Sequence, residues 1–330
     1  MTKPANYLDA AIVSVADMEQ SRNFYRDTIG LQELDRTNGS GSALAAYWGC
    51  SPDVEVTSCL LGLPEVSVGR VLLVDFAGAD KTPLRRDGEG MIRGHWNLNF
   101  YVDDIFDMSR RLSAAGFHFW TEPVRHELSA RTGAPIEVIF EAPDGVVINL
   151  VQPTQSQGSF VNEVYEQWKA QPSSPTGFSP VATTAQCVRD MEASIRFYRD
   201  ALGHRIVIDE VLGSPEANRF LRRPPEGRSR TVFLSSGHVF GKVALNQPQN
   251  FPVVERVDQA RAPAVGYLAQ RFRTRNLEAA VDAAYSCGAR TLARSVTGHL
   301  PGAVGRPAHL LTNPGSGALV ELIEAEDGSD

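Results

Sequence analysis

Two stretches of this chain are near copies of each other, and this repeat constrains the fold more than any other feature. Residues 15–30, VADMEQSRNFYRDTIG, recur 173 positions later as residues 188–203, VRDMEASIRFYRDALG. Two further pairs of segments agree at an offset of 172: residues 99–105 with 271–277, and residues 145–150 with 317–322. Because three separate segments keep nearly one register, the chain is a tandem duplication.

Each half contains two strand–helix–strand units. A strand pattern over residues 8–15 is followed by Asp17 at the position of a helix N-cap, and Gly30 is placed to end that helix. The same order returns three more times: at 96–102 with Asp103 or Asp104 as the cap, at 180–203, and at 266–288 with Asn276 as the cap. Short β-rich runs lie between these units. The pattern therefore predicts a mixed α+β chain with four related units.

The repeat also predicts the domain boundaries. We expect an N-terminal domain over residues 1–154, a linker over 155–179 and a C-terminal domain over 180–330. The linker is rich in Ser, Pro, Gln and Gly around one short helical stretch, Phe160 to Ala170. We expect residues 37–66 and 211–229 to form the rim of a cleft rather than part of a sheet.

Charge and composition exclude several classes of function. The 330 residues carry 32 Lys and Arg against 39 Asp and Glu, a net charge of −7 without a clustered basic patch, so a nucleic-acid partner is not expected. The N-terminus has no apolar core of a secretory signal, and no window approaches the roughly 18 apolar residues of a membrane span. Four cysteines without C-x-x-C spacing are typical of free thiols. We expect a cytoplasmic protein, monomer or homodimer, whose partner is a small molecule.

The repeated motifs resemble the vicinal oxygen chelate (VOC) superfamily. The resemblance rests on the 15–30 motif and its copy, on Val102-Asp-Asp104 after a strand, and on the closing APDGVVINL of residues 142–150. This superfamily contains glyoxalases, bleomycin-resistance proteins, methylmalonyl-CoA epimerases and extradiol dioxygenases. The resemblance implies four βαβββ modules in two tandem VOC, glyoxalase-like domains with cup-shaped mixed sheets. It also leads us to expect one cup in each half of the chain.

The resemblance also implies where a metal would bind. In metal-dependent members, two His or Gln side chains and one Glu point into the cup from fixed strand positions. In the first half these positions carry Ala10, Asn97 and Asn149. In the second half they carry Thr183, Ala269 and Glu321. Only Glu321 is a usual ligand type, so we expect no metal and no other cofactor.

Amides occupy the expected inner face of the first cup. Period-two counting places Ser14, Asn97, Asn99 and Asn149 there as substrate-binding candidates. This set is more polar than a core tolerates without partners, which favours a pocket for an oxygenated molecule. The alternative is that Asn97 and Asn149 satisfy each other across an empty site.

Two further candidates in this cup could act on protons. His95, two residues before Asn97, has a pKa suited to proton transfer near neutral pH, and Tyr101 could donate to a substrate carbonyl. The alternatives are a histidine on the rim and a tyrosine that covers the sheet edge. Trp48 could line the pocket wall, or pack in the core.

The expected inner face of the second cup carries opposite charges. Glu321 is a candidate general base oriented by Arg271, Arg273 could hold a substrate anion, and Thr183 could bind substrate. The alternative is a structural ion pair between Arg271 and Glu321, since a paired arginine lowers the pKa of a carboxylate and weakens it as a base.

Three functions remain open from the sequence. The first is a metal-independent enzyme of lyase or isomerase type, which acts with acid–base residues on a small oxygenated molecule of aromatic or polyketide-like kind. The second is a bleomycin-resistance-type protein that binds or sequesters a drug or metabolite without chemistry. The third is a metal-dependent enzyme of extradiol-dioxygenase or glyoxalase type with ligands outside the family positions.

Overall fold

The computed structural model describes residues 6–39, 42–298, 300, 302–303 and 305–325. Within them, the chain forms the four predicted modules. Module 1 has β1 (Tyr7–Val15), α1 (Met18–Asn23), β2 (Gln32–Gly39), α2 (Ser42–Tyr47), β3 (Glu55–Gly62) and β4 (Arg70–Ala77). Module 2 has β5 (Gly94–Tyr101), α3 (Ile105–Ala114), β6 (Val124–Arg125), β7 (Ile136–Glu141) and β8 (Val147–Gln152). Module 3 has β9 (Val181–Cys187), α5 (Met191–Arg196), β10 (Arg205–Leu212), α6 (Pro215–Phe220), β11 (Ser229–Ser235) and β12 (Lys242–Pro248). Module 4 has β13 (Gly266–Thr274), α7 (Leu277–Ser286), β14 (Arg290–Gly298), β15 (Arg306–Thr312) and β16 (Leu319–Glu324).

The predicted helix caps are confirmed. The side chains of Asp17, Asp104, Asp190 and Asn276 each accept a hydrogen bond from a backbone N–H in the first turn of the following helix. Between the two candidates of module 2, Asp104 is therefore the cap. The repeated Phe-Tyr-Arg-Asp segment forms a π-helical turn after α1 and again after α5, where the sequence pattern predicts a continuous α-helix.

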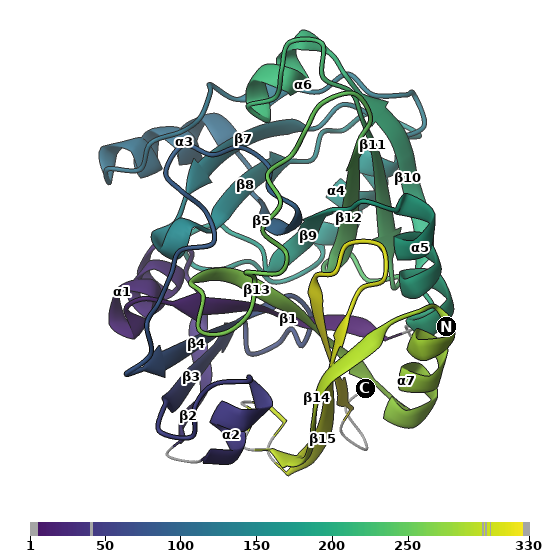
Figure 1. Ribbon diagram of the computed structural model, residues 1–330. Helices are drawn as coiled ribbons and strands as arrows, with labels where there is room; N and C mark the ends of the chain where they lie inside the picture. The colour runs from purple at the N-terminus through teal and green to yellow at the C-terminus, as the bar shows by residue number, and fades with distance from the viewer. Residues whose placement is uncertain (1–5, 40–41, 299, 301, 304, 326–330) are drawn as a thin grey trace.

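The strands form two curled, eight-stranded mixed sheets (Figure 1). One sheet has the order β14-β15-β16-β13-β1-β4-β3-β2 and the other has the order β10-β11-β12-β9-β5-β8-β7-β6. Modules 1 and 4 therefore share one sheet, through the antiparallel pair β1–β13, and modules 2 and 3 share the other, through β5–β9. The α+β fold class with cup-shaped sheets is confirmed. The expectation of one cup in each half of the chain is wrong, because a repeat identifies the modules without saying whose edge strands pair.

One of the two expected rim segments, residues 37–66, differs from the structure, whereas in the other residues 213–228 lie outside the sheet as expected. Residues 37–66 contain the end of β2, the helix α2 and the whole of β3, and β3 is paired on both sides in its sheet. Residues 211–229 contain α6, with β10 ending at Leu212 and β11 starting at Ser229. In β3, Glu55–Gly62, exposed and buried residues alternate only at the start of the strand. The period-two pattern that predicts a strand is therefore short in this segment.

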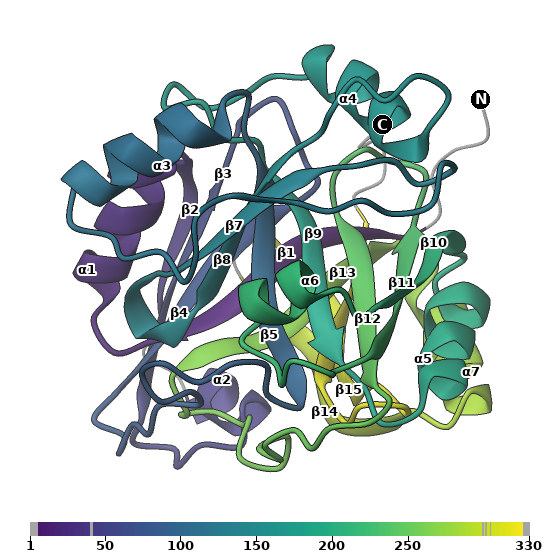
Figure 2. The same ribbon diagram turned by 90° about the horizontal axis from the view of Figure 1, so that it is seen from above.

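The two sheets pack together along a buried seam that includes polar side chains. Gln186 of β9 donates to the Gln270 side chain of β13 over 2.9 Å, and Gln270 donates to the Thr184 hydroxyl over 2.6 Å. Figure 2 shows both sheets from above, with β9 and β13 next to each other at the centre. Because these buried amides are paired, they fix how the sheets sit on each other without an unsatisfied polar group.

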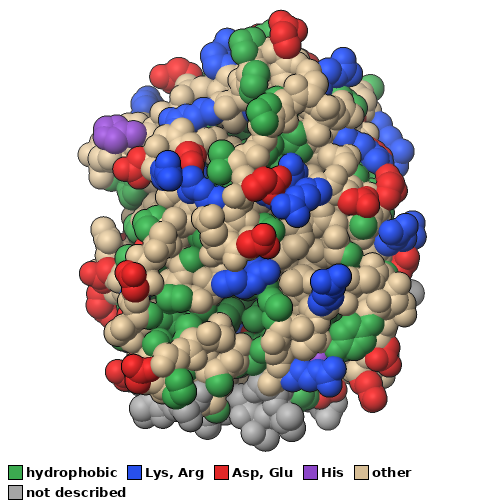
Figure 3. All heavy atoms as spheres, in the orientation of Figure 1, with side chains coloured by type: hydrophobic (Ala, Val, Ile, Leu, Met, Phe, Trp, Pro, Cys, Tyr) green, Lys and Arg blue, Asp and Glu red, His purple; other side chains and the backbone are tan. Residues whose placement is uncertain are grey.

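The outside of the molecule carries mixed charge. Figure 3 shows one face, on which acidic and basic side chains are interspersed. No helix among the described residues is long and apolar enough to cross a membrane.

Candidate functional site

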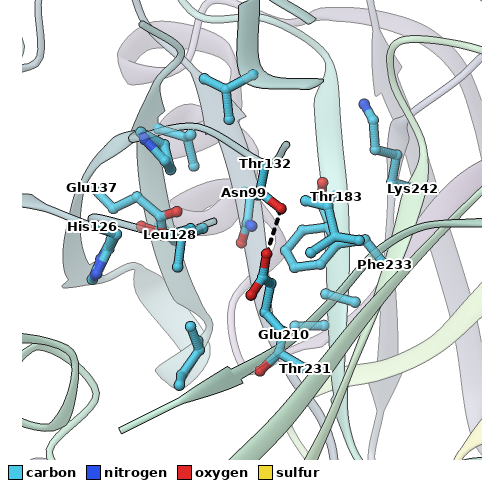
Figure 4. A pocket seen from close by; sticks show the side chains of 18 of the residues that line it. Asn99, His126, Leu128, Thr132, Glu137, Thr183, Glu210, Thr231, Phe233 and Lys242 are labelled. Atoms are coloured by element: carbon cyan, nitrogen blue, oxygen red, sulfur yellow. Dashed lines mark hydrogen bonds between the residues drawn. The ribbon is translucent and has the colours of Figure 1, made fainter. Parts of the chain in front are cut away.

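The sheet of modules 2 and 3, β5–β12, curls around a cavity, and we call it the open cup. The cavity contains about 1030 Å³ of space not filled by atoms, including solvent at its mouth. Seven of the eight strands of this sheet contribute to the wall, together with α4 (Phe160–Lys169), Phe220 of α6 and the loop that follows β6. Most wall side chains are apolar, and Figure 4 shows the polar ones that point inward. An apolar cavity with a few convergent polar groups is typical of a small-molecule site.

Four amides line this cavity: Asn246 accepts a hydrogen bond from Thr231, and the side-chain oxygens of the other three have no partner among the described residues. Asn97 and Asn99 lie on β5, and Asn149 lies on β8 directly opposite Asn99. All three are at most 7% exposed, and none of their side-chain oxygens has a hydrogen-bond partner among the described residues. The predicted alternative, a hydrogen bond between Asn97 and Asn149, is not formed among the bonds found in the structure. Buried polar atoms without a partner are costly, so these oxygens are available to a ligand or to water.

A carboxylate and a phenol stand beside these amides. Asn149 Nδ2 donates to Glu137 Oε2 of β7 over 2.7 Å, and this bond holds the carboxylate in the wall of the cavity. Burial, and after it the negative charge of Glu137, raises the pKa of Tyr101 on β5. Tyr101 therefore keeps its proton at neutral pH and can donate it in a hydrogen bond.

A lysine lies on the opposite side of Asn99 from Glu137 (Figure 4). Lys242, the first residue of β12, is 3% exposed and lines the cavity. Its ammonium donates to the Tyr101 hydroxyl over 3.1 Å and to the Val239 carbonyl oxygen. Burial lowers the pKa of Lys242 to about 7. No carboxylate among the described residues pairs with the ammonium group to offset this effect.

A second carboxylate, that of Glu210, links the two edges of the open cup. Thr132, in the loop between β6 and β7, donates to Glu210 Oε1 of β10 over 2.6 Å (Figure 4). Ser129 donates to the same oxygen. Burial raises the pKa of Glu210, but the two hydroxyl donors outweigh it and the net pKa is lowered. These bonds join strands from opposite ends of the sheet order, and they hold the curled sheet together.

The segment expected to be a linker forms part of the site. Its helix α4 presents Phe160, Val161 and Val164 to the cavity, and Trp168 packs against the Tyr101 ring with 5.5 Å between the ring centroids. The short helical stretch is confirmed. It covers one side of the open cup, and therefore does more than connect two domains.

The sheet of modules 1 and 4, which we call the packed cup, is filled by its own side chains. A cluster of buried apolar residues from both modules occupies its inner face, including Trp48, Leu72, Ala269 and Leu310. Glu321 and Arg271 are completely buried within it and form an ion pair, and Tyr47 donates to Glu321 Oε1 over 2.8 Å. The structure thus matches the alternative of a structural ion pair. It does not bring Glu321 or Arg271 to the cavity.

Four other candidates also lie away from the cavity. Arg273 pairs with Asp9, Trp48 packs against Phe76, and Ser14 is buried in β1. His95 was expected on the same face as Asn97, and that expectation is wrong because a β-bulge between the two residues turns His95 to the other side. Its Nε2 lies 2.8 Å from the Leu319 carbonyl oxygen in the seam between the sheets, and burial lowers its pKa to about 4.

The structure brings together five of the predicted residues, and their roles stay predictions. They are Asn97, Asn99, Tyr101, Asn149 and Thr183. Thr183 was expected in the second cup, but it lies opposite Asn99 in the β5–β9 pair. The cavity also holds residues that the sequence analysis did not select: Lys242, Glu137, Glu210 and His126. Lys242 and Glu137 each alternate with apolar residues in their strands. The same alternation is typical of a strand with one face exposed to solvent, so it does not identify a cavity.

The residues of the open cup do not fit a divalent ion of the kind that the resemblance implies. Three of the strand positions equivalent to the family ligands carry Asn97, Asn149 and Thr183. The fourth carries Ala244, because Ala244 pairs with Ala185 in the same way that Asn149 pairs with Asn99. Amide and hydroxyl oxygens are weak ligands for such an ion. Nowhere in the described part of the chain do three His, Cys, Asp or Glu side chains form a group that could hold a metal.

Solved structures with a similar fold include two proteins that align with nearly the whole of this chain. Glyoxalase I from Zea mays aligns with a TM-score of 0.64 at 19% identity, over 97% of this chain and 92% of the maize chain. A putative dioxygenase from Bacillus subtilis aligns with a TM-score of 0.60 at 13% identity, over 99% of this chain and 87% of the other. At these identities the likeness concerns the fold alone. No curated protein sequence matches the chain.

The sequence itself matches a family model in both halves. The description of that family is Glyoxalase/Bleomycin resistance protein/Dioxygenase superfamily, and the match covers residues 7–150 and 181–322. These two ranges contain all four modules described above except the last two residues of β8 and of β16. The chain therefore belongs to the Glyoxalase/Bleomycin resistance protein/Dioxygenase superfamily.

Proposed function

We propose that the protein is an enzyme of lyase or isomerase type that acts in the open cup, without a metal, on a small oxygenated molecule with an apolar or aromatic body. The observation that carries this proposal is the carboxylate of Glu137, held by Asn149 in an apolar wall beside the protonated phenol of Tyr101. A positioned carboxylate can remove a proton from carbon, and a phenol can stabilise the charge that develops on a neighbouring oxygen.

The amides support the choice of substrate. The unpartnered oxygens of Asn97, Asn99 and Asn149 are hydrogen-bond acceptors, so they favour a ligand with hydroxyl groups. The aromatic side chains of Trp96, Phe160 and Phe233 line the apolar part of the cavity and fit a flat ring.

The proposed chemistry is a proton transfer next to a carbonyl group. Glu137 takes a proton from the carbon beside the carbonyl, and Tyr101 donates a hydrogen bond to the carbonyl oxygen as it becomes an enolate oxygen. Return of the proton to another carbon gives an isomerase, and loss of a leaving group from the enolate gives a lyase.

Proton exchange tests this proposal directly. We expect the protein to exchange the protons beside the ketone of 4-hydroxyphenylacetone for deuterium from D2O, followed by NMR. Glu137→Gln keeps the size of the side chain and removes the base, so the exchange rate should fall by about a hundredfold or more. The matched control is Glu163→Gln, on the exposed face of α4, which should keep the wild-type rate. Equal rates in wild type and Glu137→Gln would overturn the role of Glu137.

A second candidate function is binding without chemistry. It is favoured by the donor set at the family ligand positions, which does not fit a metal, and by the apolar wall. If the wild-type protein binds the ketone by calorimetry but exchanges no proton, the binding function replaces the enzymatic one. The free thiols of Cys50, Cys59, Cys187 and Cys287 support a reducing, cytoplasmic location for either function.

A further inference from the structure

We propose that Lys242 is a nucleophile that forms an imine with the carbonyl group of the ligand in the open cup. The substrate would then be an aldehyde or a ketone. This inference rests on the proposed function, because it assigns the carbonyl activation in the same cavity to a named side chain.

The surroundings of Lys242 suit a neutral amine. The side chain is 3% exposed, and its hydrogen-bond partners are a phenol and a backbone carbonyl rather than a carboxylate. Burial alone lowers the pKa of Lys242 to about 7, so about half of the amines are neutral at that pH, against less than about one in a thousand for an ordinary lysine. A neutral, desolvated lysine amine is the form that attacks carbonyl groups.

Two titratable groups face this amine. Tyr101 accepts its hydrogen bond, and the negative charge of Glu137 acts in turn on Tyr101. His238 lies near Lys242 on the β11–β12 turn, and burial together with the charge of Lys242 lowers its pKa. The lowered pKa of His238 disfavours a second positive charge beside Lys242 at neutral pH.

The step balances with the groups present. The Lys242 nitrogen adds to the carbonyl carbon, the C=O bond breaks and a C=N bond forms. The oxygen leaves as water with the two protons that the amine loses, and Tyr101, 3.1 Å from the nitrogen, can pass a proton from nitrogen to oxygen. When the imine nitrogen takes up a proton from solvent or from Tyr101, the resulting iminium ion makes the neighbouring C–H more acidic than the ketone does, so Glu137 would remove its proton more readily from this adduct.

Borohydride trapping tests the inference on the full chain. The protein is incubated with 4-hydroxyphenylacetone and sodium cyanoborohydride at pH 7, and the adduct is located by peptide mass spectrometry among the four lysines of the sequence. We expect Lys242 to be trapped about five hundredfold faster or more than Lys81 or Lys169, as its larger neutral fraction requires. The trapping rate should rise with pH through about 7 and then level off.

Two variants make the result specific. Lys242→Met removes the amine with little change in volume, and should abolish the adduct while its circular dichroism stays native. Lys169→Met removes an exposed lysine that pairs with Asp103, and should leave trapping unchanged. An adduct spread over the other lysines, or none on Lys242 in a protein that binds the ketone, would overturn the inference.

The two proposals fail in distinguishable ways. Proton exchange that continues at the wild-type rate in Lys242→Met would remove the imine and keep the acid–base function. Trapping on Lys242 without any proton exchange would keep the imine and remove the role of Glu137. Should Lys242→Met fail to fold, the pH profile of trapping on the wild-type protein still decides the question.

Discussion

The open cup and the packed cup are built from the same module, and they differ in what fills them. In module 1 the segment between the second and third strands forms α2, and Tyr47 and Trp48 at its end lie inside the packed cup. In module 3 the corresponding segment forms α6, and Phe220 and Leu221 at its end contribute to the wall of the open cup. The end of α2 therefore helps to fill the packed cup, whereas the end of α6 leaves the cavity of the open cup unfilled.

The polar residues of the two cups differ in the same way. In the packed cup the carboxylate of Glu321 is satisfied by Arg271 and Tyr47, and it has no contact with solvent. In the open cup the amide oxygens of Asn97, Asn99 and Asn149 lack partners among the described residues. A satisfied buried network stabilises a fold, whereas unsatisfied groups around a cavity indicate a site.

The largest expected effect comes from breaking the ion pair of the packed cup. Glu321→Ala leaves the Arg271 guanidinium buried without its carboxylate, so the free energy of unfolding should fall by about 3–5 kcal/mol. Urea unfolding measures the change, and Asp107→Ala, which breaks an exposed ion pair with Arg110 on α3, should cost no more than about 0.5 kcal/mol. Below the melting temperature, the variant should still bind the ligand of the open cup. A stable variant that has lost ligand binding would instead mean that Glu321 takes part in the ligand site.

An added ring should separate the two cups next. Ala269 is completely buried among the apolar residues of the packed cup, so Ala269→Phe should destabilise the protein by about 1–3 kcal/mol or more. Ala244 lines the cavity of the open cup, so Ala244→Phe should cost less than about 1 kcal/mol, because the ring enters space that is already empty. It should also weaken ligand binding by about tenfold or more, measured by calorimetry. Equal destabilisation by both substitutions would mean that the open cup is no more open than the other.

The sequence predicts the modules well because their signals are local. The caps Asp17, Asp104 and Asn276 and the repeated 15–30 motif depend on neighbouring residues only, and they identify the four modules. The metal positions follow from the same alignment, which is why Asn97 and Asn149 were found.

The rest of the site depends on contacts that sequence periodicity does not contain. Lys242 and Glu137 line the same cavity only because β9 pairs with β5, a choice between equivalent edge strands far apart in the chain. His95 leaves the expected face because of a bulge, and a bulge shifts the period of two without changing the residue pattern. Glu321 looks like a surviving ligand until the position of Tyr47 is known.

The smallest expected effect concerns the closure of the open cup by Glu210. The pKa of Glu210 is lowered in the folded protein because Ser129 and Thr132 donate to its carboxylate, and this outweighs the effect of burial. A carboxylate with a lowered folded pKa contributes stability above its unfolded pKa of about 4.3, and that contribution is lost as the pH falls through the folded value. Thr132→Val removes one donor with little change in shape, so at pH 7 it should cost about 1 kcal/mol. The difference from wild type in urea unfolding should shrink as the pH falls through the lowered folded pKa of Glu210, below which both proteins carry a neutral Glu210. A difference that stays constant with pH would mean that the threonine acts by packing. Apolar contacts alone would then hold the two edges of the open cup together.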